Sequence, residues 1–142
     1  MKKHLAGTAV AVIFAAMTLA SATPSWAQES APMKVKVPFD FMVENDRMPA
    51  ADYTIQRIVN GHLRLQSKDG RVSLTVIALP AQAKSAPEKA HFIFHCYAGN
   101  CFLANIWTPG LDVGWQLLAG KFEQELARNK TAPLETATVL GQ

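Results

Sequence analysis

The chain has 142 residues, of which 49% are apolar, and it carries two cysteines and a net charge of +3. These totals exclude a disordered chain, a multidomain enzyme, a collagen-like repeat and a disulfide-dense mini-protein, and the length suits a single domain. The positive charge by itself would suggest a nucleic-acid partner, so its distribution along the chain has to be considered.

The first 27 residues have the organisation of a secretory signal peptide. Residues 2–4 are basic or histidine, residues 6–20 carry no charge, and the sequence SWA follows at 25–27. A basic start, an apolar run of about 7–15 residues and small residues at −3 and −1 of the cut are typical of export. We expect cleavage between Ala27 and Gln28, with a cut after Ala22 as second choice, and a periplasmic or extracellular location.

Cleavage at this position removes Lys2 and Lys3 and changes the charge balance. Residues 28–142 hold twelve Lys and Arg against eleven Asp and Glu, which leaves a net charge of +1. This near-neutral sequence has no run of basic residues, so we expect no nucleic-acid partner. No later segment reaches the roughly 20 apolar residues of a spanning helix, so we expect no integral membrane segment in the mature chain.

The first predicted strand covers residues 34–44 (KVKVPFDFMVE), after a short linker at 28–33. Apolar and polar side chains alternate along it, which is typical of a strand with one buried face. Pro38 cannot donate a hydrogen bond to a neighbouring strand, so we expect an edge strand or a bulge there. Oligomerisation through this edge is left open. Residues 45–52 have the composition of a turn.

A hairpin is predicted around Asn60-Gly61, which separates strands at 53–59 and 62–68. This dipeptide favours a tight turn because both central residues of a type I′ turn need positive φ. Two registers remain open. A two-residue turn pairs Ile58 with Leu63, whereas a three-residue loop brings the apolar residues of both strands to one face.

The next hairpin, around Asp69-Gly70, allows one register without adjustment. Leu65 then lies opposite Leu74 and Leu63 opposite Val76, so that the apolar side chains share one face, as a buried sheet requires. Residues 80–90 are predicted to form a loop.

A third hairpin joins the strands 91–97 (HFIFHCY) and 101–107 (CFLANIW). Six strands with short links predict an all-β fold, an antiparallel six-stranded meander that forms a small barrel or a sandwich.

The C-terminal part changes to helical spacing after a loop at 108–114. Its apolar residues are Trp115, Leu118, Ala119, Phe122 and Leu126. Gly120 weakens a helix by about 1 kcal/mol relative to Ala, so the helix starts either at Trp115 or near Lys121. We therefore expect a β-meander domain with one C-terminal helix over 34–128, and a flexible tail at 129–142.

The two cysteines lie in the third hairpin. A turn centred on Ala98-Gly99 places Cys96 opposite Cys101, with Cα atoms about 4.5 Å apart in a non-hydrogen-bonded pair. This separation suits a disulfide, and an exported protein meets an oxidising compartment. We therefore predict a Cys96–Cys101 disulfide. A redox pair is disfavoured because four intervening residues on a hairpin differ from a CxxC motif at a helix start.

A metal site built from His91, His95 and the cysteines is also disfavoured. Residues four apart in a strand are separated by about 13 Å, so the two histidines cannot bind one ion, and Cys96 points away from His95. We predict no metal site and no cofactor.

The same register divides the hairpin into two faces. One is predicted to be core and carries Phe92, Phe94, Cys96, Cys101, Leu103 and Trp107. The other is unusually apolar for a solvated surface, and we interpret it as a possible binding face: His91, Ile93, His95, Tyr97, Phe102, Ala104 and Ile106. Coverage by the helix through Leu118, Phe122 and Leu126 is the favoured interpretation. The alternative is an exposed or cavity-lining surface that meets a ligand or a partner.

Sequence motifs of enzymes are missing: the chain has no G-x-S-x-G, no H-E-x-x-H, no phosphate-binding loop and no paired-cysteine zinc pattern. We assign no catalytic residue and expect that the chain is not an enzyme. The leading hypothesis is an exported binding or envelope-associated β module, with an unknown protein or a small apolar ligand as its partner. The alternatives are a barrel-type carrier of a small apolar ligand, and a hydrolase or redox enzyme that uses His95 or Cys96.

Several motifs resemble a family of small exported proteins of soil bacteria with the pattern VPFDF, LPAGxYT and FHxYGxxYFLxxIW. The corresponding segments are VPFDF (37–41), MPAADYT (48–54), FHCYAGNCFLANIW (94–107) and KFEQELAR (121–128). The resemblance implies export and a β fold, and it implies no activity, cofactor or partner. The chain departs from the pattern at Ala51, where glycine is usual, and at Cys96 and Cys101, which makes the disulfide a local staple.

Overall fold

The computed structural model describes residues 31–59, 61–129 and 132–142. The predicted signal peptide and its cleavage site between Ala27 and Gln28 lie outside these residues. In the described ranges no helix is long and apolar enough to cross a membrane.

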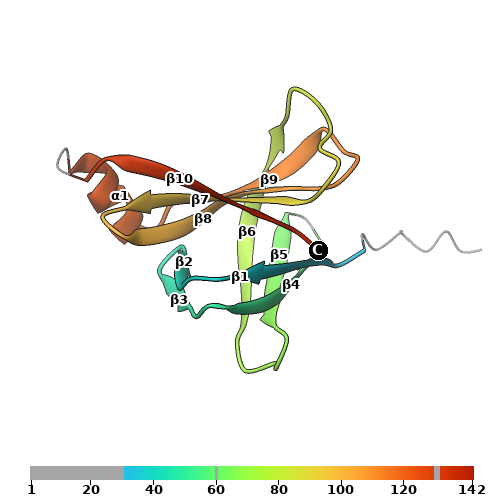
Figure 1. Cartoon of the computed structure of the whole chain (residues 1–142), viewed down its shortest axis with the longest axis horizontal. Helices are drawn as coiled ribbons and strands as arrows, with labels where there is room; N and C mark the ends of the chain where they lie inside the picture. The colour runs from blue at the N-terminus through green and yellow to red at the C-terminus, as the bar shows by residue number, and fades with distance from the viewer. Residues whose placement is uncertain (1–30, 60, 130–131) are drawn as a thin grey trace, which may run out of the picture.

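Within these ranges the chain forms ten strands and one helix (Figure 1). The elements are β1 (Met33–Val37), β2 (Phe41–Val43), β3 (Asp46–Met48), β4 (Ala51–Arg57), β5 (His62–Ser67), β6 (Ser73–Gln82), β7 (His91–Tyr97), β8 (Asn100–Trp107), β9 (Val113–Leu117), α1 (Lys121–Arg128) and β10 (Leu134–Leu140). The predicted all-β fold with one C-terminal helix is confirmed, although the sheet has more strands than the six expected.

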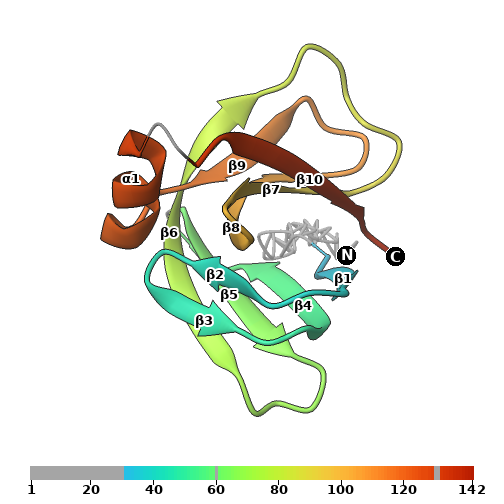
Figure 2. The same cartoon turned by 60° about the vertical axis from the view of Figure 1, so that its left-hand side comes forward.

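The strands form one open, strongly twisted sheet in the order β1-β4-β5-β6-β9-β8-β2-β3, and β7 joins β8 to β10. The long strand β6 runs through both halves of the sheet and pairs first with β5 and then with β9 (Figure 2). The described strands do not close the predicted barrel. A single bridge between Val35 and Gly141 links the two ends, with no ladder between β1 and β10.

The predicted first strand is divided into β1 and β2, which pair with different neighbours. Pro38 stands between them, where a missing N–H is tolerated because the chain leaves one ladder before it joins another. The Asp40 carboxylate accepts a hydrogen bond from the Ala50 backbone N–H at 2.9 Å and fixes this crossing. The expected turn at 45–52 contains a further short strand, β3, which forms a hairpin with β2.

The second hairpin has the predicted register. Leu65 pairs with Leu74, and Leu63 pairs with Val76. In the first hairpin the Ile58 N–H donates to the His62 carbonyl, and Ile55 pairs with Leu65. The three-residue alternative therefore holds.

The C-terminal part differs from the prediction in two places. Residues 113–117 form β9 between β6 and β8, so Trp115 is in a strand, and the helix begins at Lys121, the later of the two predicted starts. Pairing on both sides overrides the helical spacing, which is only a local preference. The expected tail contains β10, which pairs with β7 along all seven residues. Ala137 and Val139 pack against the core from it.

Both halves of the sheet contribute to one apolar core. Its innermost side chains include Val35, Val43, Ile55, Leu63, Leu65, Phe92, Phe94 and Ile106, each at most 2% exposed. Edge-to-face contacts between Phe41, Tyr53 and Phe94 lie within it. Because the inward side chains of the strands form this core, the outer side of the sheet is where a site can lie.

Candidate functional site

The outer side of the β7–β8 hairpin differs from its predicted composition because of a bulge. The register shifts between Ile93, which pairs with Asn105, and Phe94, which pairs with Leu103. Ala104 is the extra residue, and beyond it the two faces of β8 exchange. Ile106 therefore lies in the main core, not on the outer side.

The same shift corrects the predicted core. Trp107 pairs with Gly114 in β9 and lies on the outer side, opposite His91. A Cβ on Gly114 would lie 2.3 Å from Cε3 of Trp107, so the indole packs directly on the glycine backbone. The other members of the proposed face, His91, Ile93, His95, Tyr97 and Phe102, stay on the outer side of the strands.

Helix α1 covers one end of this face. Phe122 contacts Phe102 with ring centroids 5.8 Å apart, and Leu126 packs on the small cluster formed by Tyr97, Phe102 and Ala132. Leu118, which the sequence analysis expected to cover the face, is 46% exposed. His91 and Ile93 lie at the other end of β7, so the helix covers the face in part.

The start of α1 is held against the β2–β3 turn. Gly120 is buried, and a Cβ there would lie 2.5 Å from the backbone oxygen of Glu44. Only glycine permits this approach. This contact holds the N-terminal end of α1 close to the β2–β3 turn.

A cleft of about 290 Å³ lies between α1 and the outer side of β7, β8 and β9. Its apolar lining is Ala104, Leu117, Leu118, Ala119 and Ala127, and its polar lining is His95, Tyr97, Asn105, Gln116, Glu123 and Gln124. Small-molecule sites combine an apolar surface with converging polar groups that orient the ligand, and this cleft offers both.

Glu123 is the central polar group of the cleft. Its residue is 7% exposed, and its Oε1 atom lies 3.8 Å from Nδ1 of His95. Within the described residues no protein group donates a hydrogen bond to this carboxylate. Burial raises the pKa of Glu123 above its ordinary value, and burial together with the Glu123 charge raises the pKa of Tyr97. The cleft therefore holds a largely buried carboxylate whose nearest ionisable neighbour is His95.

The disulfide lies beside this cleft, on the opposite face of the hairpin. Cys96 and Cys101 are bonded, with Cα atoms 4.0 Å apart, in the predicted register. Ala98 and Gly99 form the turn with positive φ, as expected for this tight connection. Cys96 faces the core whereas His95 faces the cleft, so these two residues do not share a site. The chain has no free cysteine.

Among the described residues, no group of three or more His, Cys, Asp or Glu side chains is arranged to hold a metal ion. Asn105, Gln116 and Glu123 were not predicted as site residues. The one visible sign of a site was Asn105, a polar residue within the apolar run CFLANIW. Glu123 gave no such sign, because it lies next to the apolar stripe of the helix and was expected to face solvent.

We find no match to this chain among models of known protein families, among curated proteins or among solved structures. The resemblance to small exported proteins of soil bacteria therefore stays a prediction that depends on the quoted motifs.

Proposed function

We propose that this chain is an exported, non-enzymatic binding module whose ligand site is the cleft under α1. The observation that carries the proposal is Glu123, a largely buried carboxylate that faces a preformed space and accepts no hydrogen bond from the described residues. Its oxygens still reach the cleft, since no fully buried polar atom of the described residues lacks a partner, and an acceptor in this position is where a ligand donor would bind.

The cleft chemistry favours a small amphipathic amine. The carboxylate of Glu123 and the amide groups of Asn105 and Gln116 offer hydrogen-bond acceptors to an ammonium group, while Leu117 and Ala127 contact an apolar body. A charge-assisted hydrogen bond in a shielded site is about twice as strong as a neutral one. A ligand carboxylate would instead meet Glu123 as a like charge.

The core packing supports the cleft over the interior as the ligand site. A carrier would need a cavity lined by the inward side chains of β1, β5 and β7. Leu63 and Phe92 are completely buried, and they pack with the other inward side chains into one cluster. Close packing of this kind leaves little room for a guest.

The test is a titration of the ¹⁵N-labelled protein with three probes of one length: hexylamine, hexanol and hexanoate. We expect hexylamine to shift the amide signals of His95, Asn105, Gln116 and Glu123, with weaker effects of the alcohol and weakest effects of the acid. Glu123→Gln should remove the preference for the amine. Glu125→Gln, an exposed residue on the same helix, should retain it.

Two results would contradict the proposal. One is the absence of any shift in the cleft with millimolar hexylamine. The other is a set of shifts centred on inward residues such as Leu63 and Phe94, which would favour the carrier instead.

A further inference from the structure

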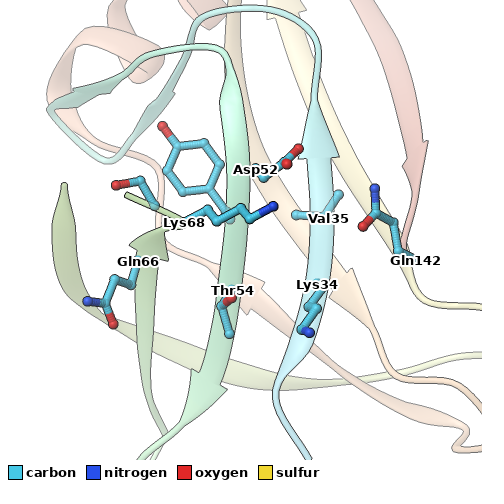
Figure 3. A pocket seen from close by; sticks show the side chains of 9 residues that line it. Lys34, Val35, Asp52, Thr54, Gln66, Lys68 and Gln142 are labelled. Carbon is cyan, nitrogen blue, oxygen red and sulfur yellow. The ribbon is translucent and has the colours of Figure 1, made fainter. Parts of the chain in front are cut away.

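A second, separate surface is formed by the outer sides of β1, β4 and β5 (Figure 3). The concave space there has a volume of about 450 Å³, and it is lined mainly by the outward side chains of Lys34, Asp52, Thr54, Gln66, Lys68 and Gln142. We call this surface the basic trough. It lies on the half of the sheet that α1 does not contact.

The strand register arranges the charges of the basic trough in rows across the sheet. Lys34 lies beside Thr54, which lies beside Gln66. In the next row Lys36 pairs with Asp52, and the Lys68 N–H donates to the Asp52 carbonyl at 2.8 Å. Rows are separated by about 7 Å, because outward side chains alternate along a strand.

A third row pairs Gln56 with Arg64. Each row thus has one positive charge more than negative charges, although the residues after the predicted cleavage site have a net charge near zero. Within the described residues, Lys34, Lys36, Arg64 and Lys68 make no ion pair. The cations are exposed.

We propose that the basic trough binds a linear polysaccharide that carries carboxylates. The charges fit a polymer with repeated negative charge, and the Thr54 hydroxyl and the Gln66 and Gln142 side-chain amides between them suit its hydroxyl groups. Lysine binds such anions as a point charge without fixed geometry, which suits a repeating chain.

The trough chemistry disfavours two other polyanions. Single-stranded nucleic acids need aromatic side chains for base stacking. The aromatic ring beneath the trough belongs to Tyr53, which is 2% exposed and hydrogen-bonded to the Pro49 carbonyl. Stable binding to a lipid surface needs apolar side chains or a lipid anchor in addition to basic charge, whereas the outward residues of the trough are polar.

The test measures binding of the mature protein to polygalacturonate at low ionic strength, with neutral dextran as the control polymer. We expect binding to polygalacturonate alone, with an affinity that falls as salt rises. Lys34→Gln combined with Lys68→Gln should weaken it about tenfold or more. Lys84→Gln combined with Lys89→Gln, two exposed residues between β6 and β7, should leave it unchanged. Asp52→Asn should strengthen it, because the negative charge of the trough is removed.

Several results would overturn the proposal: no binding of polygalacturonate, equal loss in both double variants, weaker binding by Asp52→Asn, or tighter binding to single-stranded DNA or to anionic lipid vesicles. All substitutions are on solvent-exposed or partly exposed positions, and unchanged thermal unfolding shows that each variant is folded. Glu123→Gln should not change this binding, which separates it from the cleft.

Discussion

Glu123 shows how one side chain links stability to binding. Its carboxylate is shielded from water by α1 and by the outer side of the sheet, and its near neighbours with ionisable groups are His95 and Tyr97. Such a group lowers the stability of the folded state when it is ionised, because the unfolded chain hydrates the charge better. Proteins keep groups of this kind mostly where they serve a function.

The raised pKa of Glu123 predicts a pH dependence with a defined sign. As the pH rises from the ordinary carboxyl pKa through the higher folded-state pKa, the unfolded chain loses its proton first, so the free energy of unfolding falls. Glu123→Gln should remove this loss. Its stability relative to the native protein should therefore increase as the pH rises from about 4 to about 7, measured by urea unfolding.

Glu125→Gln is the matched control, because Glu125 is exposed on the same helix, and its difference from the native protein should stay constant. A Glu123→Gln variant that becomes relatively less stable with rising pH would show that the carboxylate is stabilised by a partner such as protonated His95, contrary to this interpretation.

The disulfide is expected to make a modest contribution to the free energy of unfolding. Cys96 and Cys101 close a very short loop at the end of the β7–β8 hairpin, whose two strands are already paired with each other. The chain-entropy model then gives about 2 kcal/mol. Cys96→Ala combined with Cys101→Ala should lower the free energy of unfolding by about this amount without loss of the fold. Mass spectrometry of the non-reduced exported protein that found two free thiols would contradict the pairing itself.

At the scale of elements, the sequence predicted those strands whose turns carry a local pattern. Asp69-Gly70 and Ala98-Gly99 determine their hairpins within a few residues: the first register was correct throughout, and the second was correct from the turn as far as the bulge at Ala104. The β9 and β10 strands have no such pattern. Only Ala137 and Val139 of β10 face the core, and the bulge at Ala104 depends on which strands flank β8.

The candidate site was predictable in part for the same reason. His95 and Tyr97 follow from the alternation within one strand, which is visible in the sequence. Glu123 joins them through the docking of α1 on the β2–β3 turn, which brings together residues far apart in the chain. A contact of this kind leaves no periodic pattern.

Hydrogen exchange provides the test of β10. If residues 134–140 pair with β7 as a full strand, alternate amides of this segment should exchange slowly, together with those of β7. The loop at 84–89, between β6 and β7, serves as the internal reference for fast exchange. Exchange of every amide of 134–140 at the rate of that loop would contradict the pairing and restore the predicted tail.

For the whole molecule, the packing of the core distinguishes a binding module from a carrier, because a carrier needs an internal cavity. Leu63 is completely buried, whereas Leu79, on the outer face of β6, is 49% exposed. Leu63→Ala should cost about 2–5 kcal/mol of unfolding free energy. Leu79→Ala should cost less than about 1 kcal/mol. Thermal and urea unfolding measure both.

Near-equal stability of the two variants would show that the interior tolerates empty space. That result would favour the apolar carrier over the packed core described above.

The central claim is that the cleft under α1 holds a ligand. Its most direct test is native mass spectrometry of the protein purified from an exporting cell. We predict a reproducible extra mass that organic solvent releases, that Glu125→Gln retains and that Glu123→Gln loses. A clean polypeptide mass for the native protein, or an extra mass that Glu123→Gln retains in full, would contradict the claim.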